Sequence, residues 1–338
     1  MPGGRTSKDL DLSGRRVLVT GAGGFIGGHL VDRLVRDGAE VRALVRYNSR
    51  NERGTLDWLP PETVRDVEVQ LGELRDLESV DRAVESCEVV FHLGAQIAIP
   101  YSYVNPRDYL ETNAIGTLNI AQSALRHEVA RVVHTSTSEV YGTARQIPIT
   151  EDHPIEPQSP YAASKVAADK LIDSYHRSFE LPAVVLRPFN TYGPHQSARA
   201  VIPTIISQAL EGDVLRLGSL DPRRDLTFVT DTVDGFVRAA QSPAAIGRTV
   251  QLGTEHDVSV GDIVRVVGEL LGKELTVELD PARVRPEGSE VMRLISSPRL
   301  AGELMGWAPT VGLEDGLRRT IEWIERSRAR YRTEHYVI

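Results

Sequence analysis

Short apolar runs alternate with amphipathic segments through the first two thirds of the chain. Each run holds four or five mostly aliphatic residues, which is typical of a buried strand, and the segments between them repeat apolar residues at helical spacing. The runs predict strands at 16–20, 41–45, 67–71, 89–93, 183–187 and from residue 132 onwards. Because strand and helix alternate through about residue 192, the pattern predicts an α/β protein with a doubly wound parallel sheet.

Beyond residue 192 the alternation loosens, and we expect a smaller C-terminal lobe that binds substrate. The pattern predicts strands at 214–217 and 226–229 and helices at 201–211, 260–271, 298–305 and 313–325, with Asp231 capping a further helix that ends at Ala240. The chain shows no repeat and no long linker, so the two parts should interleave. We expect a larger domain formed by 14–192 plus about 224–256, and a lobe formed by about 193–223 plus 257–326.

Three evenly spaced glycines, Gly21, Gly24 and Gly27, separate the first predicted strand from the first amphipathic helix. Glycine allows a tight turn there and lets the backbone approach a pyrophosphate, whose charge the free N–H groups of the helix N-terminus then bind. This placement predicts a Rossmann domain that binds NAD(P), with Phe25 and Ile26 also at the cofactor.

The end of the second predicted strand bears on the choice of cofactor. A site that prefers NAD usually has an acid there for the ribose 2′-hydroxyl, whereas a nearby arginine accommodates a 2′-phosphate. This chain has Val45 at that point, followed by Arg46, Ser49 and Arg50. The sequence therefore favours NADP slightly over NAD, with a solvated basic loop as the alternative.

Further residues at strand ends are expected to line the cofactor site. They are Glu73, Leu74, Leu93 and Ala95. Glu73 would meet the adenine amino group, unless it is only an exposed acid of its loop. His92 lies inside the fourth apolar run, and we interpret it as a core residue.

The stretch after the fourth strand is predicted to be a loop followed by a long helix. Residues 97–105 are apolar and carry tyrosines, and a hexose would pack against such a loop. Pro106 suits the first turn of a helix, which we expect to run to about His127.

Polar side chains follow the strand that begins at Val132. Thr137, Ser138 and Glu139 stand at its C-terminal end, which is where open α/β sheets bind their ligands. These three residues are therefore candidates for contact with a substrate.

A helix that carries a tyrosine and a lysine on one face is predicted to begin near residue 160. Ser159 is a candidate N-cap and Pro160 suits the first turn. Tyr161 and Lys165 are four residues apart, so they share one face with Cβ atoms about 5–6 Å apart. A free tyrosine has a pKa of about 10, which a neighbouring ammonium lowers.

Tyr161 could then take a proton from a sugar hydroxyl while hydride leaves the same carbon, with Thr137 holding that hydroxyl. The alternative is a tyrosine and a lysine on a solvated helix.

Composition narrows the classes of partner. The chain has 338 residues, a net charge of −8 and a pI of about 5.7, which argue against a nucleic-acid surface. No apolar run reaches the roughly 18 residues that span a membrane, and residues 1–13 lack the apolar core of a signal peptide. The single cysteine, Cys87, allows no internal disulfide and should be a packing residue. We expect a cytoplasmic protein without a metal site.

Together these motifs resemble those of the extended short-chain dehydrogenases/reductases, and more narrowly the NAD(P)-dependent nucleotide-sugar epimerase/dehydratase group. The resemblance extends over about residues 16–326. It rests on the glycine spacing, the strand end at His92-Leu93-Gly94-Ala95, Asn113, Tyr161-x-x-x-Lys165, Arg187-Pro188-Phe189-Asn190 and Arg224-Asp225.

The resemblance implies roles that the pattern alone does not assign. It implies catalysis by Thr137, Tyr161 and Lys165, contact of Tyr161 and Lys165 with the cofactor, and binding of a nucleotide-diphosphate sugar. The implied substrate-binding residues are Asn190, Val201, Arg224, Arg285 and Glu290. Arginine suits phosphate because its planar fork pairs at two points, although Arg224 could instead be a surface ion pair and Asn190 a turn residue. Family analogy also implies a homodimer joined through the helices at 106–127 and 161–179.

Glu139 distinguishes among the reactions of this group. Once C4 of a hexose is a ketone, the hydrogen on C5 is acidic and a carboxylate can remove it. Water then leaves from C6 and hydride returns there, which gives a 4-keto-6-deoxy sugar. A 4-epimerase needs no such base, so Glu139 favours a 4,6-dehydratase.

The triplet Thr137-Ser138-Glu139 is similar to that of GDP-mannose 4,6-dehydratases, and the overall run to dehydratases of N-acetylglucosamine nucleotides. The dTDP-glucose enzymes carry an aspartate where Ser138 stands, so here Glu139 would serve both proton transfers while Ser138 orients the leaving hydroxyl. UDP-glucuronate decarboxylases also carry Thr-Ser-Glu, and they are the first alternative. A 4-epimerase is the second, and a non-catalytic nucleotide sensor is the third.

Overall fold

A seven-stranded parallel sheet forms the centre of the protein, whose computed structural model describes residues 10–283, 288 and 290–331. The strand order is β10-β6-β5-β4-β1-β2-β3, and neighbouring strands all run parallel. The strands are β1 (Arg16–Thr20), β2 (Glu40–Val45), β3 (Val67–Leu71), β4 (Val89–His92), β5 (Arg131–Thr135), β6 (Ala183–Pro188) and β10 (Thr249–Leu252). This confirms the predicted doubly wound fold, whose strand order reverses between β1 and β4, where such sheets bind ligands.

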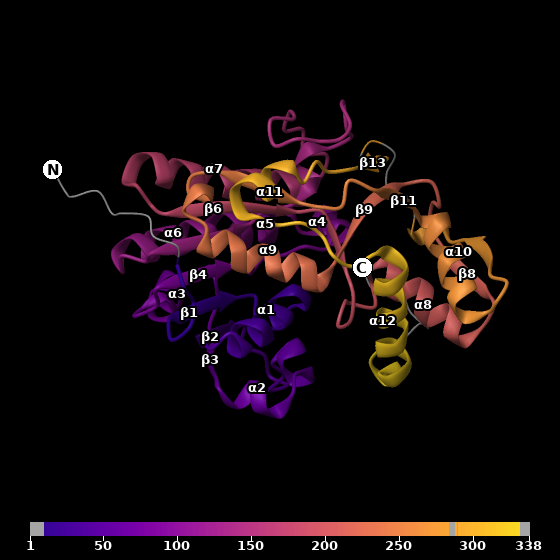
Figure 1. The fold of residues 1–338 in the computed structure, drawn as a ribbon, viewed down its shortest axis with the longest axis horizontal. Coiled ribbons are helices and arrows are strands. Elements are labelled where there is room, and N and C mark those ends of the chain that lie inside the picture. Colours follow the sequence, from indigo (N-terminus) through magenta and orange to yellow (C-terminus); the bar gives the residue numbers. More distant parts are fainter. Residues whose placement is uncertain (1–9, 284–287, 289, 332–338) are drawn as a thin grey trace.

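Helices cover both faces of the sheet (Figure 1). On one face α1 (Phe25–Arg36) packs against α9 (Val229–Gln241), and α11 (Arg299–Met305) packs on α9. On the other face lie α3 (Leu77–Val84), α6 (Gly116–Arg126) and α7 (Pro160–Phe179). The apolar strands are therefore buried from both sides, which explains why they read as continuous runs in the sequence.

A smaller set of elements extends beyond one end of the sheet (Figure 1). The strands of this smaller set are β7 (Asn190–Tyr192), β8 (Val214–Leu217), β9 (Arg223–Phe228), β11 (Asp257–Ser259), β12 (Thr276–Leu279) and β13 (Arg293–Leu294). The strand β9 pairs with β7, β11 and β13, and β12 pairs with β8. Its helices are α8 (Val201–Glu211), α10 (Val260–Leu271) and α12 (Leu313–Arg326).

The stretch after β4 differs from its prediction. Residues 97–105 are not a plain loop, because α4 (Ile99–Val104) forms within them. The predicted helix from Pro106 divides into α5 (Pro106–Tyr109), a π-helical turn at Leu110–Ile115, and α6. The π turn carries Asn113, whose side chain bonds to another segment, and such turns occur often at functional sites.

Shorter helical segments connect the main elements. They are the helix α2 (Pro61–Arg65) and the 3-10 turns η1 (Gly54–Trp58), η3 (Ser138–Tyr141), η4 (Pro243–Ala245), η5 (Pro281–Arg283) and η7 (Arg328–Arg330). None of the described helices combines the length and the apolar composition that crossing a lipid bilayer requires.

Asp231 does not cap α9 as predicted. Because β9 runs directly into α9, the N-cap position falls on Phe228 and Asp231 lies in the first turn. Its carboxylate accepts hydrogen bonds from the backbone N–H groups of Thr310 and Val311, both at 2.9 Å. The residue therefore fixes the C-terminal segment to α9.

The two residues that we interpreted as packing residues are both buried. Cys87 is 4% exposed and His92 is 2% exposed. The His92 ring shares hydrogen bonds with the hydroxyls of Thr20 (2.8 Å) and Thr117 (3.0 Å), so it joins β4 to β1 and α6. The core interpretation of His92 is confirmed.

Candidate active site

The predicted catalytic helix begins where the sequence places it. The Ser159 side chain accepts a hydrogen bond from the Ala162 N–H at 3.1 Å, and Pro160 is the first residue of α7. Tyr161 and Lys165 face inward from the first two turns and are 8% and 4% exposed. The alternative of a solvated pair on the helix surface is therefore wrong.

The strand end after β5 meets this helix. Thr137 is the N-cap of η3 and accepts a hydrogen bond from the Glu139 N–H at 3.3 Å. The side chain of Thr137 also shares a hydrogen bond with the Tyr161 phenol. Ser138 is 3% exposed and lies between the two half-buried residues. The structure thus brings the predicted catalytic residues of β5–η3 and α7 together.

The Glu139 carboxylate is close enough to Tyr161 for its charge to favour the neutral phenol. Among the described residues, no ion pair engages this carboxylate. It is half-buried rather than enclosed, so it can reach a ligand that lies over Tyr161.

The charge state of the pair differs from the prediction. Burial raises the pKa of Tyr161, and the charge of Glu139 adds to this effect, whereas the hydrogen bond with Thr137 opposes it. Burial also lowers the pKa of Lys165 to about 8. Both groups lose solvation, so each favours its neutral form. In the protein without ligands the phenol is protonated, and the expected lowering by Lys165 alone is wrong.

Asn113, to which the sequence assigned no role, supports the position of α7. Its amide oxygen accepts a hydrogen bond from the Gln96 N–H at 2.7 Å, and its amide nitrogen donates to the Ser164 hydroxyl at 2.9 Å. Ser164 lies between the two predicted catalytic residues of α7. Asn113 therefore fixes α7 against the segment after β4.

The glycine-rich turn has the shape that a dinucleotide requires. A Cβ atom on Gly21 would lie 2.8 Å from the Gly94 nitrogen, and one on Gly27 would lie 2.2 Å from the Gly21 oxygen. The helix α1 begins at Phe25 after Gly24, without a side-chain cap, so the N–H groups of its first turn, including that of Ile26, are available to an anion. The residues fit the diphosphate of NAD(P).

The other predicted cofactor residues lie around this turn. Leu74 packs against Gly94, with its Cδ1 atom 2.7 Å from where a Cβ would stand. Leu93 and Ala95 flank that glycine and are partly exposed. Glu73 forms an ion pair with Arg75 at 3.4 Å, so an adenine would have to compete with this partner.

The loop after β2 presents its charges to solvent. Arg46, Ser49 and Arg50 are exposed, and the Asn48 side chain organises the loop by accepting from the N–H of Arg50 at 3.0 Å. Among the described residues, neither arginine has an acidic partner. These arginines are therefore available to an anionic ligand.

The predicted nucleotide-binding residues are partly brought together. Arg224 on β9 forms an ion pair with Glu290, at 3.4 Å between Nη2 and Oε1. The Asn190 Oδ1 atom is buried and has no hydrogen-bond partner among the described residues, and Val201 is 41% exposed at the start of α8. Arg285 lies outside the described residues.

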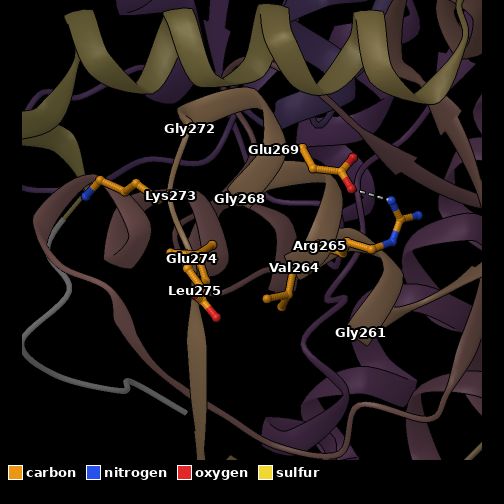
Figure 2. Close-up of a pocket in the computed structure, with 9 residues that line it drawn as sticks. All are labelled: Gly261, Val264, Arg265, Gly268, Glu269, Gly272, Lys273, Glu274 and Leu275. Atoms are coloured by element: carbon orange, nitrogen blue, oxygen red, sulfur yellow. Dashed lines mark hydrogen bonds and ion pairs between the residues drawn. The ribbon is translucent and has the colours of Figure 1, made fainter.

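A groove of about 610 Å³ lies along α10, far in the sequence from these residues, and is lined by Gly261, Val264, Arg265, Gly268, Glu269, Gly272, Lys273, Glu274 and Leu275. Figure 2 shows that its Arg265 and Glu269 bind each other, at 2.7 Å. The groove contains none of the predicted site residues. Within the described chain, no cluster of acidic, histidine or cysteine side chains could hold a metal ion.

Comparison with known proteins identifies the family of the chain. Residues 18–320 match the family model described as GDP-mannose 4,6 dehydratase. The chain belongs to this family. The match extends over nearly all of the chain, and it confirms the resemblance to the nucleotide-sugar branch of the extended short-chain dehydrogenases/reductases.

Members of the family that resemble the chain catalyse different reactions. It is 35% identical to a UDP-glucose 4-epimerase of Mycolicibacterium smegmatis, over 91% of this chain and 98% of the relative. It is 31% identical to UDP-glucuronic acid decarboxylase 1 of Xenopus tropicalis, over 96% of this chain and 75% of the relative. The solved structure of DesIV, a dTDP-glucose 4,6-dehydratase of Streptomyces venezuelae with NAD bound, is 28% identical and superimposes with a TM-score of 0.81, covering 93% of this chain and 98% of that one.

Proposed function

We propose that the protein is a nucleotide-sugar 4,6-dehydratase, which converts an NDP-hexose to the NDP-4-keto-6-deoxy sugar. The observation that carries this proposal is the placement of Glu139, whose backbone N–H bonds to Thr137 and whose charge acts on the Tyr161 phenol. NDP-N-acetylglucosamine is the first substrate to test. The chain is then an NAD(P)-dependent lyase.

The first step is oxidation at C4 of the hexose. A nicotinamide cofactor held at the glycine-rich turn would supply the acceptor for the C4 hydride and the hydride that C6 receives after water is lost. The Lys165 ammonium favours the Tyr161 phenolate, which opposes the burial that keeps the phenol neutral in the free protein. Tyr161 takes the proton of the 4-hydroxyl, and Thr137 holds that oxygen.

The second step is elimination of water across C5 and C6. The 4-ketone makes the C5 hydrogen acidic, and the Glu139 carboxylate removes it as a proton. The bond between C6 and its hydroxyl then breaks, and that hydroxyl leaves as water with a proton from Glu139. Ser138 orients the hydroxyl. Glu139 therefore ends the step ionised, as it began. The enone is reduced when C6 receives hydride and C5 accepts a proton from solvent, which gives the 4-keto-6-deoxy sugar.

The relatives supply two alternative reactions on the same C4 ketone. A UDP-glucuronate decarboxylase would lose the C6 carboxylate as carbon dioxide, and a 4-epimerase would return the hydride to C4 from the opposite face. The 35% identity to a UDP-glucose 4-epimerase supports the second alternative. A 4-epimerase needs no base that removes the C5 proton, so Glu139 favours the dehydratase over the epimerase. The decarboxylases carry the same Thr-Ser-Glu triplet, so the product formed has to decide between the dehydratase and the decarboxylase.

Incubation with NDP-hexoses and with an NDP-glucuronate, followed by mass spectrometry, separates these reactions. A product that has lost water supports the dehydratase. Loss of carbon dioxide would establish the decarboxylase instead. An unchanged mass with a changed sugar configuration would establish the epimerase, and an unchanged sugar would leave a nucleotide-binding protein without catalysis.

We also propose that the cofactor is NADP rather than NAD. The support is the pair of exposed arginines after β2, Arg46 and Arg50, which have no acidic partner among the described residues. Together with Ser49 they would bind the 2′-phosphate, a group that pairs well with guanidinium.

A homodimer is the third part of the proposal. Apolar side chains are exposed on the neighbouring helical segments α4 to α7, namely Val104 (68%), Leu110 (52%), Ile115 (44%), Leu125 (37%) and Phe179 (55%). A second copy of the chain would cover them. Light scattering should give twice the mass of one chain, and Leu110→Glu should reduce it to a single chain.

A further inference from the structure

The inward face of α7 carries a third charged residue that the proposed reaction does not use. Tyr161, Lys165 and Asp169 follow one another at intervals of four residues, so they lie along one stripe of the helix. Asp169 is only 6% exposed. A buried carboxylate is costly unless its partners compensate for the lost solvation, so its contacts indicate what the residue does.

Asp169 is held by three residues from the neighbouring strands. Its Oδ2 atom accepts hydrogen bonds from the Ser136 hydroxyl at 2.6 Å and from Arg187 Nη2 at 2.8 Å. Its Oδ1 atom lies 3.3 Å from His134 Nε2. Although burial opposes ionisation, the close approach of His134 and the charge of Arg187 hold the pKa of Asp169 well below its usual range.

Arg187 is itself fixed on the far side of this pair. Its Nη1 atom donates to the Tyr141 hydroxyl at 2.7 Å, and its guanidinium lies over the Tyr141 ring at 4.7 Å from the centroid. The side chain is 5% exposed. Arg187 thus cannot turn away from Asp169 without leaving a buried charge unpaired.

Among the described residues, Asp169 is the anion whose charge acts on Lys165. The two histidines packed beneath it, His92 on β4 and His134 on β5, are neutral at pH 7 because burial lowers their pKa values, that of His134 to about 4. The phenols of Tyr161, Tyr109 and Tyr141 are also neutral, because burial raises the pKa of each. Arg187 is positive, and the Glu139 carboxylate acts on Tyr161.

Burial and Asp169 act on Lys165 in opposite directions. Burial lowers the pKa of this residue, the charge of Asp169 raises it, and the resulting pKa is about 8. The carboxylate one turn away therefore favours the charged form of the lysine.

We propose that Asp169 is a positioning residue, which Arg187 and Ser136 keep ionised so that it holds the Lys165 side chain in its charged form. The part that concerns catalysis rests on the proposed role of Tyr161 in C4 oxidation. Because the ammonium favours the phenolate, Asp169 sets the alkaline pH above which Tyr161 ceases to act as a base.

A small cleft connects this pair with solvent. It has a volume of about 210 Å³ and is lined by Asp169 and Arg187 together with Glu151, Ile155, Val166, Lys170, Asp173, Arg177, Gly247 and Thr249. None of Thr137, Glu139 and Tyr161 lines it. Water can therefore reach Asp169 by a route that a bound cofactor and sugar over Tyr161 would leave open.

The charge of Lys165 can be measured directly in the protein without ligands. The chain has only four lysines, Lys8, Lys165, Lys170 and Lys273, so ¹³C-labelled lysine gives four NMR signals, and the signal that Lys165→Met removes is that of Lys165. We expect it to titrate near pH 8, below the roughly 10.4 of an ordinary lysine. Asp169→Asn should lower this midpoint by at least about one pH unit.

Two variants serve as controls. Asp173→Asn removes a carboxylate one turn further along α7, where it pairs with Arg177, and should leave the midpoint of Lys165 unchanged. Asp169→Glu keeps the charge and should keep most of the wild-type midpoint. An Asp169→Asn protein whose Lys165 titrates as in the wild type would overturn the proposal.

Asp169→Asn removes the anionic partner of the buried Arg187, and a second variant guards against a failure to fold. Asp169→Asn combined with Arg187→Gln removes both charges together, and we expect the same lowered midpoint. An unchanged midpoint in this double variant also contradicts the proposal.

A second readout is the pH profile of cofactor reduction, followed by absorbance on mixing with NDP-hexose. The alkaline limb should move to lower pH in the Asp169 variants and should stay in place in Asp173→Asn. A limb that does not move while the wild type reduces its cofactor contradicts the role of Asp169 in catalysis. If the wild type reduces no cofactor with any NDP-hexose, the proposed function fails, whereas the lysine titration still decides the present proposal.

Discussion

The inward face of α7 and the loop after β2 differ in how deeply their charged side chains are buried and whether those side chains are paired. On α7, Lys165 and Asp169 are buried, and Asp169 takes its partners from β5 and β6 of the same chain. In the loop after β2, Arg46 and Arg50 are exposed and have no acidic partner among the described residues. In the proposed reaction, the charged groups near Tyr161 are therefore fixed by the protein itself, while the two loop arginines would find their partner in the cofactor. The first region reports on the class of reaction, and the second on which cofactor is bound.

The sharpest way to test this contrast is to remove the phenol on α7. Tyr161→Phe keeps the ring and its packing against Tyr109, whose ring centroid lies 6.3 Å away, but it removes the proton acceptor. We expect kcat to fall by about 10²–10⁴-fold, with cofactor affinity unchanged in a binding titration. Tyr175→Phe, near the far end of the same helix, should keep full activity. Equal losses in the two variants would mean that the phenol of Tyr161 has no special role.

The start and inward face of α7 could be predicted from the sequence, because the residues that determine them are adjacent in the chain. Ser159, Pro160 and the spacing of Tyr161 and Lys165 fix where α7 begins and which side chains share its inward face. The helix at 201–211 and the strand at 214–217 were predicted with their observed bounds. The parallel sheet followed from the alternation of short apolar runs with amphipathic helices, because strands buried on both faces read as continuous apolar runs.

What the sequence did not predict depends on residues that are far apart in the chain. Asp169 meets Arg187 and His134 only because β5 and β6 are neighbours in the sheet. The π turn carries Asn113, whose partner Gln96 lies 17 residues away in the sequence, and Asp231 lost its predicted capping role because β9 leads directly into α9. The charge state of Tyr161 was predicted incorrectly because the spacing on a helix does not reveal how deeply the helix is buried.

Acid should destabilise the α7 region more than the exposed loop. Burial and the charge of Lys165 lower the pKa of His134 to about 4, whereas the ring titrates near about 6.5 in the unfolded chain. Between these pH values the unfolded state binds the proton and the native state does not, so the free energy of unfolding falls as the pH drops from about 6.5 to 4. The contribution of this ring is about 2–3 kcal/mol.

Urea unfolding at pH 7 and pH 4.5 measures this effect. His134→Gln should lose less stability between the two pH values than the wild type does. His256→Gln, at an exposed position, should behave as the wild type. If His134→Gln keeps the full pH dependence, the neutral buried ring is not its source.

The smallest expected effect is on the exposed loop. Arg46→Ala combined with Arg50→Ala should raise the Kd for NADP about tenfold, since a charge-assisted hydrogen bond contributes about 1.5–3 kcal/mol and solvent screens it at an exposed site. The Kd for NAD should stay the same. Arg53→Ala is a matched control, because Asp57 already binds Arg53 at 2.7 Å. Equal losses for both cofactors would contradict the assignment of the two arginines to the 2′-phosphate.

The most direct test of the central claim is the fate of the hydrogen on C5. The purified protein, loaded with NADP and supplied with NDP-N-acetylglucosamine and related NDP-hexoses in heavy water, should release a 4-keto-6-deoxy product that carries deuterium at C5. Glu139→Gln should still bind the nucleotide sugar but release no such product, while Glu322→Gln on the surface of α12 should act as the wild type. A product without deuterium at C5, or an unchanged rate in Glu139→Gln, would contradict water elimination by this carboxylate.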